Sequence, residues 1–263
     1  MSSILWNLRV FRSRVVNSLE IACKVPSVYR NWAYFFWGRF SSRPGILRLR
    51  NGLQFWIRPQ SSDRASITEV QMFHPYSDPR PGSVVVDIGA NIGAFSLLAS
   101  RTARRVYAVE PIPSNYEILC RNVQLNGAPP VTAMCAAISS ENGFSTMSDD
   151  GVMSSLKWNR PDKAGATVRT ITLKDFIQEH AIESVDFLKM DCEGAEWDIL
   201  AQTDASVFGL IQHIEMEYHC MPGGPSPRLL VDRLSSVGFK SVTIRGGETE
   251  TGIIVADRSA SAT

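Results

Sequence analysis

The chain has 263 residues, of which 44% are hydrophobic and 20% are charged, and its formal net charge is +1. This composition is ordinary for a globular protein and excludes a largely disordered chain. The five cysteines show no C-x-x-C spacing, which argues against a structural zinc site and a disulfide framework. Unpaired cysteines suit a reducing compartment, so we expect a cytoplasmic protein.

Basic residues gather near the N-terminus. Residues 1–50 hold nine Lys or Arg and one acidic residue, whereas the rest of the chain holds 18 basic and 25 acidic residues. Apolar residues at helical spacing over residues 4–22 predict a basic amphipathic helix. A dense aromatic patch follows at residues 32–37 and 40. Neither stretch is long enough to span a membrane.

This N-terminal pattern has two interpretations. The arginines and aromatic rings of residues 1–40 suit peripheral contact with an anionic membrane, which would place the protein at the inner membrane surface. The favoured interpretation is a cap that packs on the core, with its arginines solvated. Binding to nucleic acid is not expected, because the aromatic residues are contiguous rather than interleaved with the basic ones.

The remaining elements follow from alternation and turn signals. Two alternating runs around Asn51-Gly52 predict a β-hairpin over residues 46–58, and a helix is expected over residues 62–73. From Val84 onwards strands alternate with helices, which predicts a mostly parallel sheet with helices on both faces. The expected strands cover residues 83–88, 105–110, 131–138, 168–172, 185–190, 211–217, 239–245 and 251–256. The expected helices cover residues 92–102, 114–126, 173–180 and 226–237, with another that starts near residue 195.

The stretch from Val84 to Ser96 predicts a buried strand that turns sharply into a helix, as in nucleotide-binding α/β proteins. Asp87 would lie at the carboxyl end of this strand, where open α/β sheets hold their ligands, and Glu110 would end the next strand, where such folds bind a ribose diol. An acid at the loop mouth repels a pyrophosphate and attracts an ammonium group. These features favour S-adenosylmethionine over a dinucleotide, which needs a G-x-G-x-x-G loop, and over a tight turn without a ligand.

Two later strands also end in ionisable residues. The predicted strand at residues 185–190 runs into Asp191, Glu193 and Glu196 around a Gly-Ala turn. Alternation along the strand near residues 211–217 places Glu215, Glu217 and His219 on one face. Because the carboxyl ends of parallel strands meet at one edge of a sheet, we expect these groups to lie near Asp87 and Glu110.

At these residues the chain resembles the FkbM family of S-adenosylmethionine-dependent methyltransferases. The resemblance covers about residues 83–219. It rests on Asp87-Ile-Gly-Ala-Asn-Ile-Gly93, Glu110-Pro111, Asn115 with Asn122 and Asn126, Lys189-Met-Asp-Cys-Glu-Gly-Ala-Glu196, and Glu217-Tyr-His219. It implies a Rossmann-like class I methyltransferase fold, an α/β fold with a mostly parallel seven-stranded sheet whose last strand is antiparallel. It also implies O-methylation of a sugar, a glycolipid or a natural product.

The resemblance also implies a set of cofactor-binding residues. Asp87, Gly89, Asn91 and Gly93 would surround the methionine part of the cofactor, Glu110 would bind the ribose, and Asp191 would face the cofactor from the fourth strand. Ala90 and Ala137 complete the expected site. The first 80 residues lie outside the shared motifs.

Methyl transfer from a sulfonium requires the acceptor oxygen in line with the methyl group, and an alcohol must also lose its proton. The candidate catalytic residues are His219, Glu217 and Asp191. His219 is the first candidate for the base, and Glu217 is the second if burial raises its pKa. His219 could instead be a histidine that is hydrogen-bonded at a strand end.

The clustered carboxylates of Asp191, Glu193, Glu196 and Glu217 could hold a divalent cation that acidifies the hydroxyl. Alternatively, Glu193 or Glu196 caps the following helix, where the helix dipole favours a carboxylate. Capping is favoured for Glu196, whereas Asp191 and Glu193 stay open as ligands. A metal is not favoured, and no metal ligand is assigned.

The sequence thus predicts an O-methyltransferase with a small-molecule or glycan acceptor and no nucleic-acid partner. The alternative is a scaffold that has the methyltransferase fold and binds the cofactor without turnover. We divide the chain into an N-terminal extension of helix and hairpin (residues 1–80), the methyltransferase domain (81–257) and a disordered tail (258–263). The polar stretch 139–166 is expected to form a long loop or flap beside the site.

Overall fold

The structure, a computed structural model, describes residues 20–148, 165–220, 224–246 and 251–259. The predicted amphipathic helix over residues 4–22 therefore lies almost wholly outside the described residues. The same holds for the middle of the predicted flap and for most of the predicted tail. No helix within the described ranges has the length and apolar character that crossing a membrane requires.

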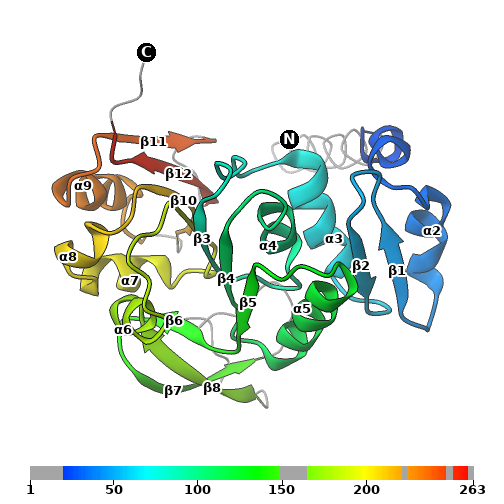
Figure 1. Cartoon of the computed structure of the whole chain (residues 1–263), viewed down its shortest axis with the longest axis horizontal. Helices are drawn as coiled ribbons and strands as arrows, with labels where there is room; N and C mark the ends of the chain where they lie inside the picture. Colours follow the sequence, from blue (N-terminus) through cyan, green and yellow to red (C-terminus); the bar gives the residue numbers. More distant parts are fainter. Residues whose placement is uncertain (1–19, 149–164, 221–223, 247–250, 260–263) are drawn as a thin grey trace, which may run out of the picture.

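A seven-stranded sheet forms the centre of the molecule, with the strand order β11-β12-β10-β9-β3-β4-β5 (Figure 1). Only β12 runs against the other strands, so the sheet is mostly parallel with an antiparallel last strand, as the resemblance implies. The predicted strands are present with shifts of a few residues at their ends, except for the one predicted at 131–138, which is divided. The strands are β3 (Val84–Ile88), β4 (Arg105–Val109), β5 (Val131–Met134), β9 (Phe187–Met190), β10 (His213–His219), β11 (Ser241–Arg245) and β12 (Thr251–Asp257).

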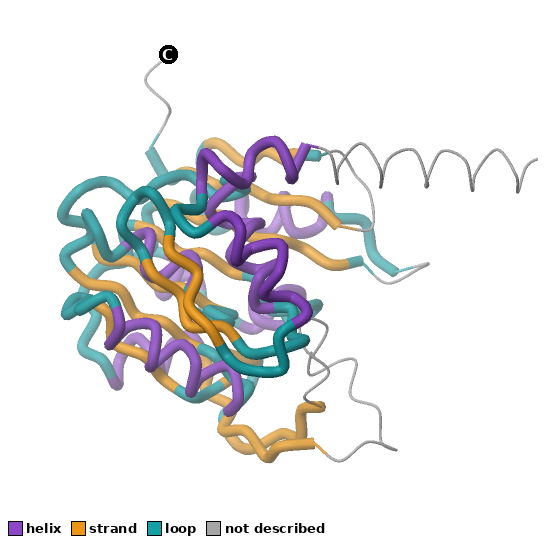
Figure 2. The backbone as a smooth tube through the Cα atoms, turned by 90° about the vertical axis from the view of Figure 1, so that its right-hand side faces the viewer, coloured by secondary structure: helices purple, strands orange, loops and turns teal. Residues whose placement is uncertain are grey.

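Helices cover both faces of this sheet because its central strands are apolar on both sides. Val84, Val86 and Ile88 of β3 pack in one cluster with residues of α6, α7 and α9, whereas Val85 packs with Phe95 of α4 on the opposite face. Figures 1 and 2 show the strands between these two layers. The helices are α4 (Ala94–Ala99), α5 (Pro113–Leu125), α6 (Leu173–Glu179), α7 (Glu196–Gln202), α8 (Ala205–Phe208) and α9 (Arg228–Ser236).

Two expectations for residues 131–166 are wrong. The predicted strand at 131–138 divides into β5 and β6 (Ala137–Ser139), and β6 belongs to a separate sheet of order β6-β8-β7. Within the predicted loop, Gly143–Ser148 forms β7, which pairs antiparallel with β8 (Gly165–Thr172). Backbone hydrogen bonds to β8 make this segment a strand, since its sequence shows no apolar alternation. This pair projects from the body of the molecule at the bottom of Figure 2.

The N-terminal region contains the predicted hairpin and helices. Strands β1 (Gly45–Arg48) and β2 (Gln54–Ile57) pair antiparallel, and the turn between them has Gly52 at φ 96°. Ahead of them lie α2 (Trp32–Trp37) and the 3-10 turn η1 (Gly38–Phe40). After them, α3 (Asp63–Thr68) continues into the π-helical turn η2 (Glu69–Phe73).

This N-terminal region packs on the central layers. One apolar cluster joins Leu47 and Phe55 of the hairpin to Ile92 before α4, to Leu97 of α4 and to Ile118 of α5. In Figure 1 the hairpin lies next to α5, with α2 at the outer edge of the molecule. The described part of the N-terminal region therefore shares a hydrophobic core with α4, α5 and the loop before α4.

Candidate active site

The loop from β3 to α4 is shaped by three residues with positive φ: Gly89 at 74°, Asn91 at 50° and Gly93 at 88°. A Cβ on Gly89 would overlap the backbone oxygen of Asp191, so only glycine allows the loop to pass this close to the end of β9. The Ala90 amide donates to the Val109 oxygen at 3.0 Å. The sharp strand-to-helix turn that the sequence predicts is therefore present, and it is held against both neighbouring strands.

Lys189 is a buried cation beneath this loop. Its Nζ lies 3.2 Å from Asp87 Oδ1 and 3.8 Å from Asp191 Oδ2, and it donates to the Gly89 oxygen at 2.8 Å. Burial opposes the charge of Lys189, but the two carboxylates raise its pKa above the usual value. Asp87 Oδ2 also accepts from Ser96 Oγ at 2.5 Å. Asp87 is thus fully buried and paired with Lys189 and Ser96.

Glu110 follows the end of β4 and is 4% exposed. Its carboxylate accepts from the amides of Asn91 at 2.7 Å and Ile112 at 2.9 Å, and from Asn115 Nδ2 at 3.3 Å. Burial raises the pKa of Glu110 to about 7, against the effect of these hydrogen bonds. The carboxylate is therefore fixed by the loop on one side and by α5 on the other.

A cavity that is partly open to solvent lies at these strand ends, where α/β folds of this kind bind their ligands. Five of the expected cofactor-binding residues line it: Gly89, Asn91, Glu110, Ala137 and Asp191. The other three, Asp87, Ala90 and Gly93, do not line its wall and lie behind it. Ala90 and Gly93 shape the loop, since the Gly93 amide donates to the Ala90 oxygen at 2.8 Å.

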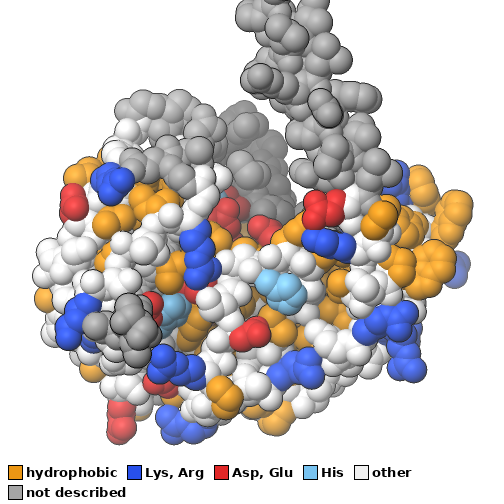
Figure 3. Space-filling model, turned by 90° about the horizontal axis from the view of Figure 1, so that it is seen from above, with side chains coloured by type: hydrophobic (Ala, Val, Ile, Leu, Met, Phe, Trp, Pro, Cys, Tyr) orange, Lys and Arg blue, Asp and Glu red, His pale blue; other side chains and the backbone are white. Residues whose placement is uncertain are grey.

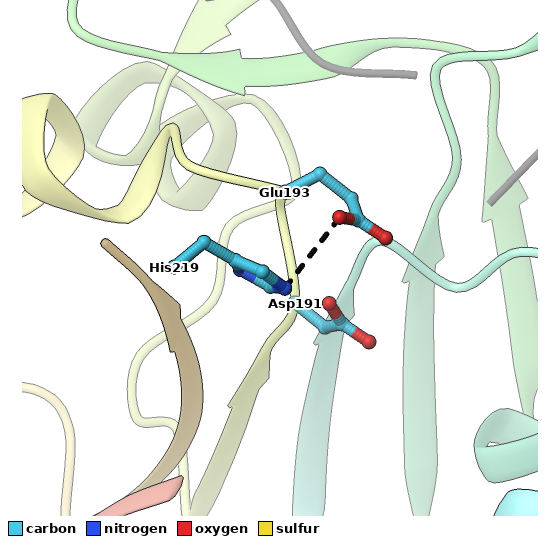
Figure 4. A group of neighbouring side chains, drawn as sticks. All are labelled: Asp191, Glu193 and His219. Carbon is cyan, nitrogen blue, oxygen red and sulfur yellow. Dashed lines mark ion pairs between the residues drawn. The ribbon is translucent and has the colours of Figure 1, made fainter. Parts of the chain in front are cut away.

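Asp191, Glu193 and His219 meet at one edge of this cavity (Figure 4). Asp191 and Glu193 follow β9 and line the cavity, whereas His219 ends β10. His219 Nε2 lies 3.5 Å from Glu193 Oε2 and 3.9 Å from Glu217 Oε1. The ends of two neighbouring strands thus place the three candidate catalytic residues, His219, Glu217 and Asp191, in one cluster, as the sequence predicts.

The cluster shifts the proton affinities of its members. Burial and the charge of Asp191 raise the pKa values of both Glu193 and Glu217 to about 7. Burial alone would lower the pKa of His219, but Glu196 and Glu193 raise it to about 9. At neutral pH, His219 is therefore an imidazolium between carboxylates, and the two glutamates are the groups that exchange protons.

Glu196 is fully buried and faces the backbone rather than the cavity. It accepts from the amides of Cys192 at 2.8 Å and Gly194 at 2.9 Å, which closes the turn ahead of α7. Its Oε1 also lies 3.4 Å from His219 Nδ1. Glu196 lies in the first turn of α7, but it bonds amides ahead of the helix and no side chain caps the first helical amides, so the capping interpretation is wrong in this detail. Glu196 instead orients the imidazole ring.

Tyr76 and Lys189 are site residues that sequence reasoning missed. The Tyr76 hydroxyl lies 3.5 Å from Asp191 Oδ2 and 3.4 Å from Glu217 Oε2. Burial, with the charges of Asp191 and Glu217, holds the pKa of Tyr76 well above its usual value, so it stays a donor. No local pattern marks Tyr76, but a lysine inside a buried strand, as in Phe187–Met190, is a signal that could have identified Lys189.

Among the described residues, Asp191, Glu193 and His219 form one group that could hold a metal ion, with ligand atoms within 4.8 Å of one another. A histidine that holds a metal must be neutral. The ion pairs of His219 with Glu193 and Glu196 stabilise its protonated form instead. The imidazolium thus already supplies positive charge where a cation would bind.

The family model and the known proteins that this chain matches agree with one another. Residues 87–241 match the family model of the methyltransferase FkbM domain. Methyltransferase sdnD from Sordaria araneosa is 28% identical over 180 residues, which cover 55% of this chain and 69% of that protein. The 31-O-demethyl-FK506 methyltransferase FkbM from Streptomyces tacrolimicus is 28% identical over 181 residues, which cover 55% of this chain and 68% of that protein.

A methyltransferase FkbM structure from Methylobacillus flagellatus is 16% identical with a TM-score of 0.47, and the match covers 72% of this chain and 47% of that one. This chain thus spans about half the length of that structure. The match to the family model includes more than half of this chain, from the cofactor loop to β11. The chain therefore belongs to the FkbM family and is an S-adenosylmethionine-dependent methyltransferase with a class I α/β fold.

Proposed function

We propose that this enzyme transfers a methyl group from S-adenosylmethionine to a hydroxyl oxygen of a sugar, glycolipid or natural-product acceptor. The observation that carries the proposal is the pair Glu193 and Glu217, two carboxyl groups whose pKa values lie near 7 at or beside the cavity. An alcohol must lose a proton during methylation, and a base with a pKa near the working pH does this best. The Streptomyces relative, by its name, acts on 31-O-demethyl-FK506, which supports an oxygen acceptor.

The cavity fits the cofactor chemically. Glu110 presents a fixed carboxylate that can accept hydrogen bonds from a ribose diol, and Gly89 leaves room at the point where the loop meets β9. Asp191 adds negative charge on the wall that would face the cationic end of the cofactor. When bound, S-adenosylmethionine supplies an electrophilic methyl group on a positively charged sulfur. Asp87 acts indirectly, by holding Lys189 beneath the loop.

In the proposed mechanism Glu217 accepts the proton of the acceptor hydroxyl. The imidazolium of His219 holds Glu217 and Glu193 in place by charge attraction at Nε2, and Tyr76 orients Asp191 and Glu217 by its hydroxyl. Of the two candidate bases, His219 is disfavoured because its proton is retained to about pH 9. No step requires a divalent cation, and no nucleic acid is proposed as a partner.

Binding of S-adenosylhomocysteine, measured by calorimetry with NADH as a control, tests the proposal. We expect micromolar affinity for S-adenosylhomocysteine, none for NADH, and at least roughly tenfold weaker binding by Glu110→Gln, since about 1.4 kcal/mol corresponds to a factor of ten. Glu183→Gln, an exposed glutamate, serves as the matched control. Binding of neither ligand would contradict the proposal. Binding without methylation of any hydroxylated acceptor would favour the non-catalytic scaffold.

Two other expectations stay predictions. One is the cytoplasmic location, together with the membrane contact considered for residues 1–40. The other is the division of the chain at residues 80 and 257 into an extension, a methyltransferase domain and a tail.

A further inference from the structure

The outer side of α2 and η1 exposes three large aromatic side chains. Trp32 is 47% exposed, Trp37 is 74% exposed and Phe40 is 70% exposed. They are half of the exposed large hydrophobic side chains among the described residues, and they lie within nine positions of one another. Single exposed hydrophobic residues are common, but such a concentration marks an interaction site.

The opposite side of α2 explains why these rings point outwards. Phe35 is buried, and its ring centroid lies 4.7 Å from that of Tyr29, which is itself fully buried. This contact anchors the helix on the N-terminal core. Trp37 and Phe40 are three residues apart and both are largely exposed, so they lie on one solvent-facing side. The packing therefore fixes the exposed rings on a rigid element.

Positive charge is concentrated in the stretch of chain that carries these rings. Residues 20–50 contain six Lys or Arg and one acidic residue, Glu20, which pairs with Lys24 at 2.7 Å. The arginines at positions 30, 39, 43, 48 and 50 are all exposed, and none of them forms an ion pair with a described carboxylate. The Arg39 guanidinium lies 4.7 Å from the centroid of the Phe40 ring.

We call the side chains of Trp32, Trp37, Phe40, Arg39 and Arg43 the aromatic-basic surface. In Figure 3, hydrophobic side chains gather at the right-hand edge with basic side chains beside them, on the side where Figure 1 places α2 and β1. We propose that this surface docks on a membrane that contains anionic phospholipids. Tryptophan and phenylalanine rings favour the boundary between headgroups and acyl chains, and arginine pairs with phosphate.

Charge also distinguishes the membrane from a second copy of this chain. A two-fold contact through the aromatic-basic surface would bring Arg39 and Arg43 of both copies together without a carboxylate between them. A bilayer with anionic headgroups supplies the missing negative charge over the whole surface. The proposal is independent of the methyl acceptor and adds a binding surface to the enzyme.

Sedimentation of the full-length chain with lipid vesicles tests the proposal. We expect the protein to partition onto vesicles of phosphatidylcholine with phosphatidylglycerol at least about tenfold more than onto phosphatidylcholine alone, and less at high salt. The double variants Trp37→Ser with Phe40→Ser and Arg39→Gln with Arg43→Gln should each lose most of this binding. Phe144→Ser is the matched control, because Phe144 is 77% exposed on β7, away from α2.

An unchanged melting temperature and an unchanged affinity for S-adenosylhomocysteine in each variant would show that the fold is intact. If the two double variants still bound vesicles, other parts of the chain would be responsible for the binding, and the proposal would be overturned. A different result would also overturn the proposal: the native chain does not bind vesicles but associates with itself, and Trp37→Ser with Phe40→Ser abolishes this self-association. The surface would then bind a second copy of the chain.

Discussion

The proposed role of Glu217 as a base depends on its burial and on the charges around it. Burial and Asp191 raise its pKa to about 7, whereas His219 keeps its proton to about pH 9. A base acts when it is deprotonated, so kcat/KM should rise as the pH passes about 7. Above about 9 it should fall, because neutral His219 no longer holds the two glutamates. Both values belong to the cluster as a whole, since its members titrate together.

Replacement of this carboxylate tests its role as the base. Glu217→Gln should lower kcat by about 10²-fold or more and remove the rise near pH 7, while S-adenosylhomocysteine affinity changes little. Initial rates over a pH series give this result, with Glu183→Gln as the surface control. If Glu193→Gln alone produced the loss, the base would be Glu193. If neither variant did, proton transfer would lie elsewhere.

Site residues that follow the end of a strand could be predicted from the sequence. Site residues that come from distant parts of the chain could not. Asp191 and Glu110 follow apolar runs in a parallel sheet, so the rule that strand ends gather ligands places them at one edge. Tyr76 reaches Asp191 across 115 sequence positions and Glu217 across 141. No local pattern encodes such a contact. The ion pair of Lys189 with Asp87 likewise depends on the pairing of β3 with β9.

At the scale of elements, two asparagines of α5 attach the N-terminal hairpin to the core. Asn122 Oδ1 accepts from the Trp56 amide at 2.7 Å, and Asn122 Nδ2 donates to the Ile92 oxygen at 2.9 Å. Asn126 exchanges hydrogen bonds with both the amide and the oxygen of Gln54. The two side chains therefore pair the free edge of β2, which would otherwise present unsatisfied backbone groups.

Loss of one of these side chains should be costly. Asn122→Ala leaves the buried Trp56 amide and Ile92 oxygen without partners, so we expect a loss of about 1–3 kcal/mol in unfolding free energy and faster exchange of the Trp56 amide. Chemical denaturation and hydrogen exchange measure both effects. Gln124→Ala, at an exposed position of the same helix, should change little. Equal effects of the two variants would show that the asparagine is dispensable.

The elements themselves were largely predictable because their patterns are local. An Asn-Gly pair between alternating runs gave the hairpin, and apolar runs separated by helical periodicity gave the sheet. Strand β7 was missed because its pattern is polar and its partner β8 lies about 20 positions away across the intervening chain. The resemblance, rather than periodicity, supplied the antiparallel direction of β12.

Across the whole molecule, the described N-terminal region shares buried surface with the β3–α4 loop, α4 and α5. Phe55 and Leu47 are fully buried in one cluster with Ile92 of the β3–α4 loop, Leu97 of α4 and Ile118 of α5. Arg58 extends the connection, since it pairs with Asp63 at 2.6 Å and donates to Asn115 Oδ1 at 2.7 Å. Asn115 in turn binds Glu110. The Glu110 carboxylate is therefore linked to the N-terminal region by a chain of contacts.

This shared core predicts that the two regions unfold together. Phe55→Ala should lower the unfolding free energy by about 3–5 kcal/mol, because it leaves a cavity in a well-packed cluster. Far-UV circular dichroism and S-adenosylhomocysteine binding should then be lost at the same, lower urea concentration. Phe144→Ala, at a side chain that is 77% exposed, should leave both transitions nearly unchanged. If ligand binding instead survived to the native midpoint while part of the dichroism was lost earlier, residues 20–80 would form a separate unit, and the core that they share with α4 and α5 would contribute little to the stability of the cofactor site.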